Sequence, residues 1–368
     1  MESATWNKPV IFDEFPKLRE LPWLRIGNMP TPVEEVPALA EKLGTGRMFI
    51  KRDDKTNAVY GGNKVRKLEF ILADVVRQGL GSMLTIGGIG SNHLLATTVH
   101  GNSQGLKTHG IVMPQPVTPH VKKSLLLYAH FGTALHLVEG DANLPGELSR
   151  LLDENAVKGN PMYFVPAGGS SPLGTIGYVE AAFELRRQIG EGLLPEPDYI
   201  FVPCGSGGTA AGLNLGARVA GLNSRVVSVQ VTDLATAFLV SQLATITSTK
   251  LHLMDRSFPK NIFLPKDLDH RDKFYGGMYG KLTPEGQEAI KMFEEIVGLD
   301  LEGVYTGKTA AAIVDAARSG ELRGKSVLYW HTFNSVSLSG VAAMHSYEEL
   351  PAKFHKFFTC DEHTCESA

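Results

Sequence analysis

The sequence predicts an α/β protein whose parallel sheets are covered by helices. Short apolar segments rich in β-branched residues alternate, along most of the chain, with segments whose apolar residues recur every three or four positions. Gly-rich turns lead from several of the expected strands into the next helix, as in parallel strand–helix units. The 368 residues are enough for two domains or one large α/β unit.

The first half of the chain begins with a lead-in up to about residue 47 that contains one short helix near Leu39. Strands are expected at 48–52, 82–86, 107–113, 134–138 and 162–165. Helices are expected to begin at Lys64 and near Ser91, and to cover 121–131 and 146–157. A turn-rich junction at 168–174 precedes the next helix, and the same alternation continues beyond it.

In the second half, strands are expected at 199–203, 225–231 and 326–330. Helices are expected after the turn at 205–209 and over 234–246, 283–297 and 309–319. Residues 250–280 are expected to be irregular, because they show neither period. We find no internal repeat and no low-complexity tract.

Composition excludes several classes of protein. With 43% hydrophobic and 20% charged residues the chain is typical of globular proteins, and its net charge of −3 argues against general nucleic-acid binding. No apolar run approaches the roughly 18 residues of a membrane span, and the first residues lack a secretory pattern. Cys204, Cys360 and Cys365 are few and odd in number, which favours a reducing, cytoplasmic setting. The Cys360-Asp-Glu-His363-Thr-Cys365 stretch lacks a second ligand cluster, so no metal site is predicted.

Lys64 is the first candidate for chemistry. It follows Gly61 and Gly62 and opens a predicted helix with an apolar face. The positive end of a helix and desolvation both disfavour a protonated amine, and an amine with a lowered pKa is a nucleophile. The alternative is an ordinary exposed basic helix start, because Arg66 and Lys67 follow.

A second candidate is the turn formed by Gly205, Ser206, Gly207, Gly208 and Thr209, between an apolar strand and a helix. Backbone N–H groups at such a helix start favour an anion, and the two hydroxyl groups add donors. No Gly-Lys-Ser/Thr follows, and the spacing differs from a dinucleotide fingerprint. The turn therefore indicates a phosphate cradle, with a plain tight turn as the alternative.

Other polar residues lie at predicted helix starts or in Gly-flanked loops. Ser91, Asn92 and His93 could hold a carboxylate at a helix start, or Ser91 could simply cap that helix. Tyr279 and Tyr305 could act as acid, base or hydrogen-bond donor, or could be packing residues. A nucleophilic lysine, a phosphate cradle and a carboxylate-binding helix start are together what pyridoxal phosphate chemistry requires.

Five motifs, in order, resemble those of the D-cysteine desulfhydrase and 1-aminocyclopropane-1-carboxylate deaminase family. They are Gly-Gly-Asn-Lys64-x-Arg-Lys-Leu-Glu, Gly-Gly-Ile-Gly-Ser91-Asn92-His93, Gly-Gly-Ser170-Ser-Pro-Leu-Gly-x-x-Gly-Tyr178, Gly-Ser-Gly-Gly-Thr209 and Val-Tyr305-Thr306-Gly-Lys. The resemblance covers roughly residues 20–345 and implies the tryptophan-synthase-β-like fold, fold type II. That fold implies two three-layer αβα domains with mostly parallel sheets: 1–64 plus 172–368 as the large domain that binds pyridoxal 5′-phosphate, and 65–171 as a small inserted domain.

The resemblance also implies roles for individual residues. Lys64 would form the Schiff base and move the α-proton, residues 205–209 would bind the phosphate, and Thr306 would face the pyridine nitrogen. Ser91, Asn92 and His93 would hold the substrate carboxylate, with Asn92 also near the phenolic oxygen of the cofactor. Tyr279 and Tyr305 would flank a small amino-acid substrate in a cleft between the domains. The family further suggests a homodimer.

Two positions favour α,β-elimination with release of keto acid and ammonia. Thr306 supplies a neutral hydroxyl where deaminases of the family carry glutamate, and His93 stands where deaminases tend to carry glutamine. Alternatives are a 1-aminocyclopropane-1-carboxylate deaminase, a racemase or β-replacement enzyme, and a cofactor-binding protein without catalysis. The family's His-Thr-Gly-Gly is replaced by His331-Thr-Phe333-Asn334, and Phe333 and Asn334 are expected to crowd the pocket.

Overall fold

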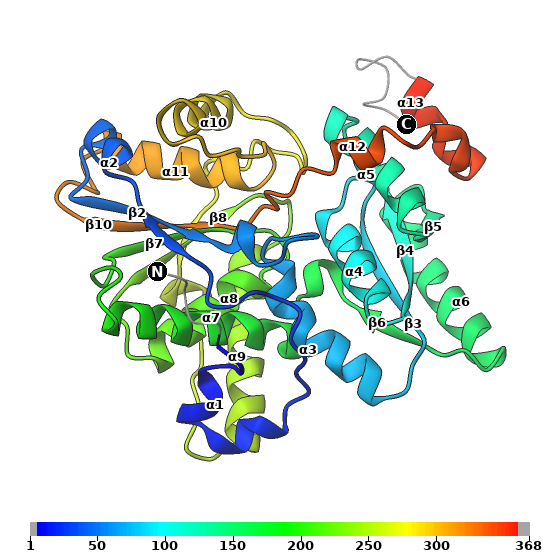
Figure 1. Ribbon diagram of the computed structural model, residues 1–368, viewed down its shortest axis with the longest axis horizontal. Helices are drawn as coiled ribbons and strands as arrows, with labels where there is room; N and C mark the ends of the chain where they lie inside the picture. Colours follow the sequence, from blue (N-terminus) through cyan, green and yellow to red (C-terminus); the bar gives the residue numbers. More distant parts are fainter. Residues whose placement is uncertain (1–5, 360–368) are drawn as a thin grey trace. The chain divides into compact units, whose positions relative to one another are not determined.

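The computed structural model of the protein describes residues 6–359. The chain divides into two compact units, and each is described by itself (Figure 1). Unit 1 contains residues 6–21, 25–70 and 170–335, and unit 2 contains residues 22–24, 71–169 and 336–359. The predicted α/β class with mostly parallel sheets is confirmed in both units.

Unit 1 is built on a six-stranded sheet with the order β1-β2-β10-β7-β8-β9. The strands are β1 (Val33–Glu35), β2 (Arg47–Arg52), β7 (Tyr199–Cys204), β8 (Arg225–Gln230), β9 (Asp269–Arg271) and β10 (Ser326–His331). Only the β1–β2 pair is antiparallel among these strands. The central strands β7 and β10 are buried along nearly their whole length, which explains their continuous apolar sequences.

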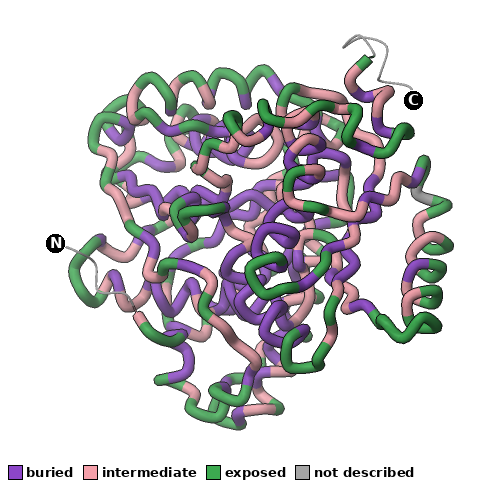
Figure 2. Tube along the Cα trace, turned by 45° about the vertical axis from the view of Figure 1, so that its right-hand side comes forward, coloured by how far each residue is buried: buried purple, intermediate pink, exposed green. Residues whose placement is uncertain are grey.

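Helices cover both faces of this sheet. The helices α2 (Pro37–Leu43), α10 (Pro284–Val297) and α11 (Thr306–Arg318) share one hydrophobic core with alternate residues of the strands, such as Ile50, Phe201 and Tyr329. The helices α7 (Pro172–Gly190), α8 (Gly208–Val219) and α9 (Thr236–Met254) lie on the other side, where α8 packs against α7 and α9 (Figure 1). Unit 1 therefore has three layers, and its buried segments run through the strands and the inner sides of the helices (Figure 2).

Unit 2 is built on a four-stranded, fully parallel sheet with the order β5-β4-β3-β6. The strands are β3 (Ser82–Gly88), β4 (Lys107–Met113), β5 (Ala134–Leu137) and β6 (Met162–Val165). The helices between these strands are α4 (Asn92–Asn102), α5 (Pro119–His130) and α6 (Leu144–Val157). At Gly110 of β4 a Cβ would lie 2.5 Å from Leu94 of α4, whereas the next residue, Ile111, belongs to a core cluster with Leu151 of α6. Neighbouring strand residues point to opposite faces, so α4 and α6 cover opposite sides of the sheet.

The structure differs from the sequence expectation after residue 335. The sequence predicts that this segment belongs to the large domain, but residues 336–359 belong to unit 2. The reason is that α12 (Ser339–Ala342) packs against α5, where the ring nitrogens of His130 and His345 lie 2.8 Å apart. The short helix α13 (Lys356–Thr359) follows in the same unit.

Residues 250–280 are also more ordered than the sequence predicts, because α9 continues to Met254 and β9 pairs with the edge of β8. The remaining helices are α1 (Ile11–Glu14) and α3 (Lys64–Arg77), with 3₁₀ turns at Pro16–Glu20, Asp53–Lys55, Asp141–Asn143, Ala167–Gly169, Pro265–Asp267, Tyr347–Glu349 and Ala352–Phe354.

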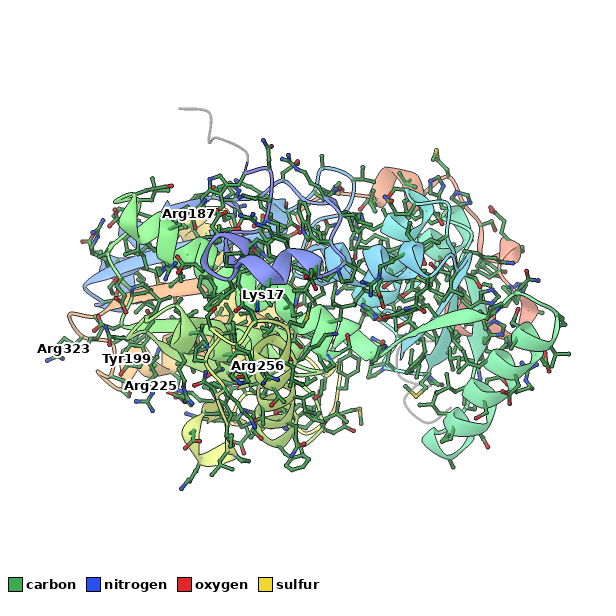
Figure 3. All side chains as sticks on the ribbon, turned by 90° about the horizontal axis from the view of Figure 1, so that it is seen from below. Lys17, Arg187, Tyr199, Arg225, Arg256 and Arg323 are labelled. Atoms are coloured by element: carbon green, nitrogen blue, oxygen red, sulfur yellow. The ribbon has the colours of Figure 1, made fainter. Side chains whose placement is uncertain are left out.

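Within residues 6–359, no helix has both the length and the apolar character that a membrane span needs. Cys204 is buried and unpaired, whereas Cys360, His363 and Cys365 lie outside the described residues. Charged side chains such as Arg225 and Arg323 project at the surface of unit 1 (Figure 3).

Candidate active site

Lys64 is the first residue of α3, directly after a sharp turn. Gly62 in this turn has φ of +95°, a conformation that favours glycine. A Cβ at Gly61 would lie 2.1 Å from the carbonyl oxygen of Asp54, so this position also requires glycine. The two glycines therefore bring the lysine to the helix start on a tightly packed backbone.

Three consecutive backbone N–H groups hold the turn before Lys64. They donate from Gly61 to Asn334 Oδ1 at 2.7 Å, from Gly62 to Asp53 O at 2.9 Å and from Asn63 to Thr332 O at 3.0 Å. The sequence predicts that Asn334 crowds the pocket, but its side-chain oxygen is engaged with the lysine turn instead. Asn334 thus belongs to the support of Lys64, a role that nothing in its local sequence indicates.

The Lys64 side chain is half-buried and electrostatically shifted. Its Nζ donates to Asn63 Oδ1 at 2.8 Å. Burial lowers the pKa of Lys64 to about 8, and the carboxylate of Glu302 opposes this shift. A substantial fraction of the amine is therefore neutral near pH 7.5, as a nucleophile or a base requires.

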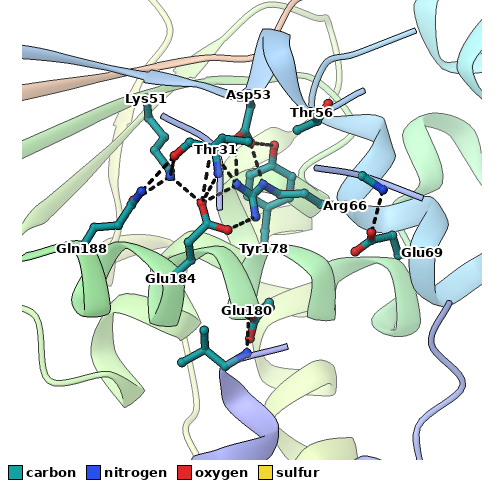
Figure 4. A network of polar contacts seen from close by, with 12 residues as sticks. Thr31, Lys51, Asp53, Thr56, Arg66, Glu69, Tyr178, Glu180, Glu184 and Gln188 are labelled. Atoms are coloured by element: carbon teal, nitrogen blue, oxygen red, sulfur yellow. Dashed lines mark hydrogen bonds and ion pairs between the residues drawn. The ribbon is translucent and has the colours of Figure 1, made fainter. Parts of the chain in front are cut away.

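A buried ionic network holds Arg66, in the first turn of α3, within unit 1 (Figure 4). Arg66 donates to Asp53 at 2.8 Å and to Glu184 of α7 at 2.9 Å. Glu184 also pairs with Lys51, and Tyr178 donates to Asp53 at 2.6 Å. These charged side chains are at most 2% exposed, so each depends on the others for compensation of its charge.

The Gly-rich turn between β7 and α8 has the geometry of an anion site. Gly207 is the N-cap residue of α8 and has φ of +87°. A Cβ at Gly208 would lie 2.6 Å from Ser170 Oγ and 2.9 Å from Lys67 Nζ. The helix start therefore carries bare backbone beside the hydroxyl of Ser170 and the amine of Lys67, which suits a phosphate.

Lys67 and Ser170 lie next to this turn, and sequence reasoning missed both. Ser170 Oγ accepts from Gly208 N at 3.1 Å and lies 2.7 Å from Ser206 Oγ, and Lys67 Nζ donates to it at 3.3 Å. Burial and the nearby charge of Lys64 lower the pKa of Lys67 well below its ordinary value. A bound anion would offset both effects. The available signal was the three-residue spacing of Lys64 and Lys67, which places both on one helix face.

Thr306 is the first residue of α11 and is fully buried. Glu302 accepts hydrogen bonds at 2.7 Å from the backbone N–H groups of Val304, Tyr305 and Thr306. The Thr306 hydroxyl accepts from Glu302 N at 2.9 Å and donates to Glu302 O at 3.1 Å. The carboxylate of Glu302 therefore lies next to this neutral hydroxyl. Glu302 is a further residue that sequence reasoning missed.

The structure brings Tyr279 and Tyr305 together. Their hydroxyl oxygens are 2.8 Å apart and their rings meet edge to face. Burial raises the pKa of Tyr279 to about 12 and that of Tyr305 well above its ordinary value, so both are neutral phenols near neutral pH. A Cβ at Gly205 would lie 3.1 Å from Tyr305 Cε1, so this pair lies beside the Gly-rich turn.

In unit 2, Ser91 caps α4, because its hydroxyl accepts from Leu94 N at 3.3 Å. His93 is buried, and its ring nitrogens lie 2.9 Å from the hydroxyl of Thr85 and 3.4 Å from that of Thr97. The His93 side chain is thus engaged inside unit 2, while the first turn of α4 presents backbone N–H groups as a helix start does.

Unit 1 therefore brings together Lys64, the turn at residues 205–209, Thr306 and the tyrosine pair. Among residues 6–359, no group of three or more His, Cys, Asp or Glu side chains is arranged to hold a metal ion. A family model described as "Pyridoxal-phosphate dependent enzyme" matches residues 24–332. The chain belongs to this family of pyridoxal-phosphate dependent enzymes.

Individual relatives are similar over most of their length. The chain is 33% identical to a protein of Pyrococcus abyssi whose name assigns it provisionally to 1-aminocyclopropane-1-carboxylate deaminase, covering 88% of this chain and 92% of that protein. It is 32% identical to a D-cysteine desulfhydrase of Klebsiella pneumoniae, covering 87% of this chain and 96% of that protein. A solved structure of an ACC deaminase homologue has a TM-score of 0.76 and 28% identity, and covers 95% of this chain.

These findings confirm the fold class inferred from the five motifs. The residues of unit 1 also fit the cofactor of this pyridoxal-phosphate dependent enzyme. Lys64 offers an amine with a lowered pKa, and the turn with Lys67 and Ser170 offers a cradle that a Cβ at Gly208 would fill. The neutral hydroxyl of Thr306 would suit the pyridine nitrogen, and the side chain of Lys67 would suit the phosphate.

Proposed function

We propose that the protein is a lyase that removes the β substituent of a small amino acid, in the manner of a D-cysteine desulfhydrase, and releases keto acid and ammonia. The observation that carries this proposal is the state of Lys64. Its amine has a pKa lowered to about 8 and is bridged through Asn63 to the Gly-rich turn. The relatives named D-cysteine desulfhydrase support elimination as the reaction class.

Lys64 has two roles in this proposal. Its amine would hold pyridoxal 5′-phosphate, and the same amine would take the Cα proton of the substrate. The bound cofactor supplies the electron sink that stabilises the resulting negative charge. Residues 205–209, together with Lys67 and Ser170, would bind the phosphate, and Thr306 would face the pyridine nitrogen.

The substrate carboxylate is assigned to the start of α4. We propose that Ser91, Asn92 and His93 hold it, with His93 contributing its backbone N–H because its ring is engaged with Thr85. Asn92 is also assigned to the phenolic oxygen of the cofactor. These three assignments come from the resemblance and from the helix start itself.

Tyr279 and Tyr305 are assigned to the neighbourhood of the leaving group. Their raised pKa values mean that they serve as neutral hydrogen-bond donors, and one can pass a proton to the other across 2.8 Å. A departing thiolate or similar group would be stabilised by such a donor. Replacing either tyrosine with phenylalanine should therefore lower kcat more than it lowers binding of the substrate.

The second candidate function is deamination of 1-aminocyclopropane-1-carboxylate. It is favoured by the names of the Pyrococcus relative and of the similar solved structure, and by the Glu302 carboxylate that touches Thr306. A carboxylate acting through a hydroxyl is a weaker partner for the pyridine nitrogen than a direct carboxylate, so elimination remains our proposal. A racemase or a β-replacement enzyme would be a third outcome on the same scaffold.

The deciding experiment measures keto acid and ammonia released by the cofactor-loaded protein from D-cysteine, L-cysteine, β-chloroalanine and 1-aminocyclopropane-1-carboxylate. Release from a β-substituted amino acid alone supports elimination and gives the handedness. Release from the cyclopropane alone overturns it in favour of the second candidate. Inversion of the substrate without keto acid identifies a racemase, and incorporation of an added thiol identifies β-replacement. The variant Lys64→Ala is the matched control and should release nothing.

We also propose a cytoplasmic homodimer. The support for a dimer is an apolar stripe on α9, in which Phe238, Ile246 and Leu253 are 54%, 49% and 60% exposed. Spacings of eight and seven residues place the three on one face of the helix. Light scattering should give twice the mass of the chain for the native protein and the mass of one chain for Phe238→Glu. A native protein with the mass of one chain would contradict the proposal.

A further inference from the structure

We propose that Asn63 is a positioning residue that couples capture of the cofactor phosphate to capture of its aldehyde. The side chain of Asn63 lies between the two groups concerned. It accepts from Lys64 Nζ at 2.8 Å and donates through Nδ2 to Thr209 Oγ1 at 3.1 Å. The inference rests on the proposed role of Lys64 and of the turn in holding the cofactor.

The direction of this relay follows from the chemistry of its ends. A lysine ammonium can only donate hydrogen bonds, so the oxygen of the Asn63 amide faces Lys64. The nitrogen of the amide then faces Thr209, whose hydroxyl oxygen must accept. The hydroxyl proton of Thr209 is therefore directed away from Asn63, and a phosphate oxygen at the helix start is a suitable acceptor for it.

The same hydrogen bond orients the amine for reaction. When Lys64 is neutral, one N–H donates to Asn63 and the lone pair remains available to attack a carbonyl carbon. Attack forms a C–N bond and moves the carbonyl π electrons to oxygen. Loss of that oxygen as one molecule of water completes the imine, so no further reactant is needed. The side chain of Asn63 thus orients two groups at once: the Thr209 hydroxyl, which can donate to the phosphate, and the Lys64 amine, which can attack the aldehyde.

The side chain of Asn63 is not needed to shape the turn. The backbone N–H of Asn63 is already held by Thr332 O at 3.0 Å, and the glycine before it by Asp53 O at 2.9 Å. Removing the amide should therefore leave the turn folded. This separation makes Asn63→Ala a clean variant, and Asn214→Ala is a matched control because its amide bonds Ala210 O within α8.

The first test measures binding without chemistry. Pyridoxine 5′-phosphate has the ring and the phosphate but no aldehyde, and its binding to the apoenzyme can be followed by calorimetry. We expect Asn63→Ala and Thr209→Val each to weaken binding roughly 3- to 10-fold, as for loss of one hydrogen bond. The double variant should be no weaker than Thr209→Val alone, because the two changes break one relay. The proposal would be overturned if Asn63→Ala bound with wild-type affinity. It would also be overturned if the losses of affinity in the two single variants multiplied in the double variant.

The second test measures capture of pyridoxal 5′-phosphate at saturating concentration, followed by absorbance and by borohydride trapping. Asn63→Ala should capture at least roughly threefold more slowly than wild type, and Asn214→Ala at the wild-type rate. An unchanged rate in Asn63→Ala would also overturn the proposal. Both tests use cofactor binding alone, so they stand even if the panel of amino acids rejects the proposed elimination. Only failure of the wild-type protein to capture the cofactor would remove the basis of both.

Discussion

The electrostatics of Lys64 lead to a prediction that needs no substrate. Burial lowers the pKa of this amine from 10.5 to about 8, and the Glu302 carboxylate opposes the shift. At pH 7.5 a group with pKa near 8 is neutral in about a quarter of molecules, whereas an unshifted lysine is neutral in about one in a thousand. The structure therefore gives the amine a roughly 200-fold larger reactive fraction at this pH.

Glu302→Gln is the perturbation that tests this account. Glutamine keeps an oxygen for the N–H groups at the start of α11 but removes the negative charge. Because that charge raises the pKa of Lys64, its removal should lower the pKa below 8. The measurement is the rate at which apoenzyme captures pyridoxal 5′-phosphate between about pH 6 and pH 10, which should rise with a midpoint at the amine pKa.

The wild-type midpoint should lie near 8, and that of Glu302→Gln should lie lower. Glu288→Gln is the matched control, because Glu288 pairs with Arg318 at the surface, and it should leave the midpoint unchanged. A wild-type midpoint near 10.5, the value of an ordinary lysine, would refute the reasoning about burial. A midpoint that rises in Glu302→Gln would refute the role assigned to the carboxylate.

Three further predictions concern stability and specificity. Arg66→Met should lower the free energy of unfolding by about 3–5 kcal/mol in urea titrations, because buried Asp53 would lose its paired cation and Glu184 would keep Lys51 but lose Arg66. Gly177→Ala should cost about 1–3 kcal/mol, since its Cβ would lie 2.2 Å from Arg66 O, whereas Gly146→Ala meets nothing and should cost little. Thr306→Glu should raise ammonia release from 1-aminocyclopropane-1-carboxylate above the wild-type level; no gain would show that this position does not select the reaction.

Elements with strong local patterns could be predicted from the sequence. The strand at 162–165 is an apolar run and the strand at 107–113 ends in one, Ile111-Val-Met113, and the structure confirms both ranges. β9 could not be predicted, because Asp-His-Arg has no apolar pattern and becomes a strand only through pairing with β8. The placement of residues 336–359 likewise depends on packing of α12 against α5, which no local signal encodes.

The site divides in the same way. Lys64 and the turn at 205–209 could be recognised because glycines before a helix start are a local feature. The link through Asn63 joins residues 146 positions apart, and the amide of Asn334 reaches a turn 273 positions away. Glu302 has a local signal, because an acid near a helix N-terminus is a known stabilising pattern. The contacts of Asn63 and Asn334, unlike the local ones of Glu302, depend on the assembled sheet and not on neighbours in sequence.

The order of strands in unit 1 has a consequence for synthesis on the ribosome. β10 lies between β2 and β7, yet it is the last strand of the sheet to be translated. Arg52 ends β2 and His331 ends β10, a separation that takes about 14–56 s at roughly 5–20 residues per second. The inner edge of β2 is unpaired throughout this interval, and that of β7 is unpaired from the time Cys204 has been added; unpaired edges promote aggregation of nascent chains. Unit 1 can therefore close its sheet only late in translation, and holding chaperones should matter more for its yield than for that of the sheet in unit 2.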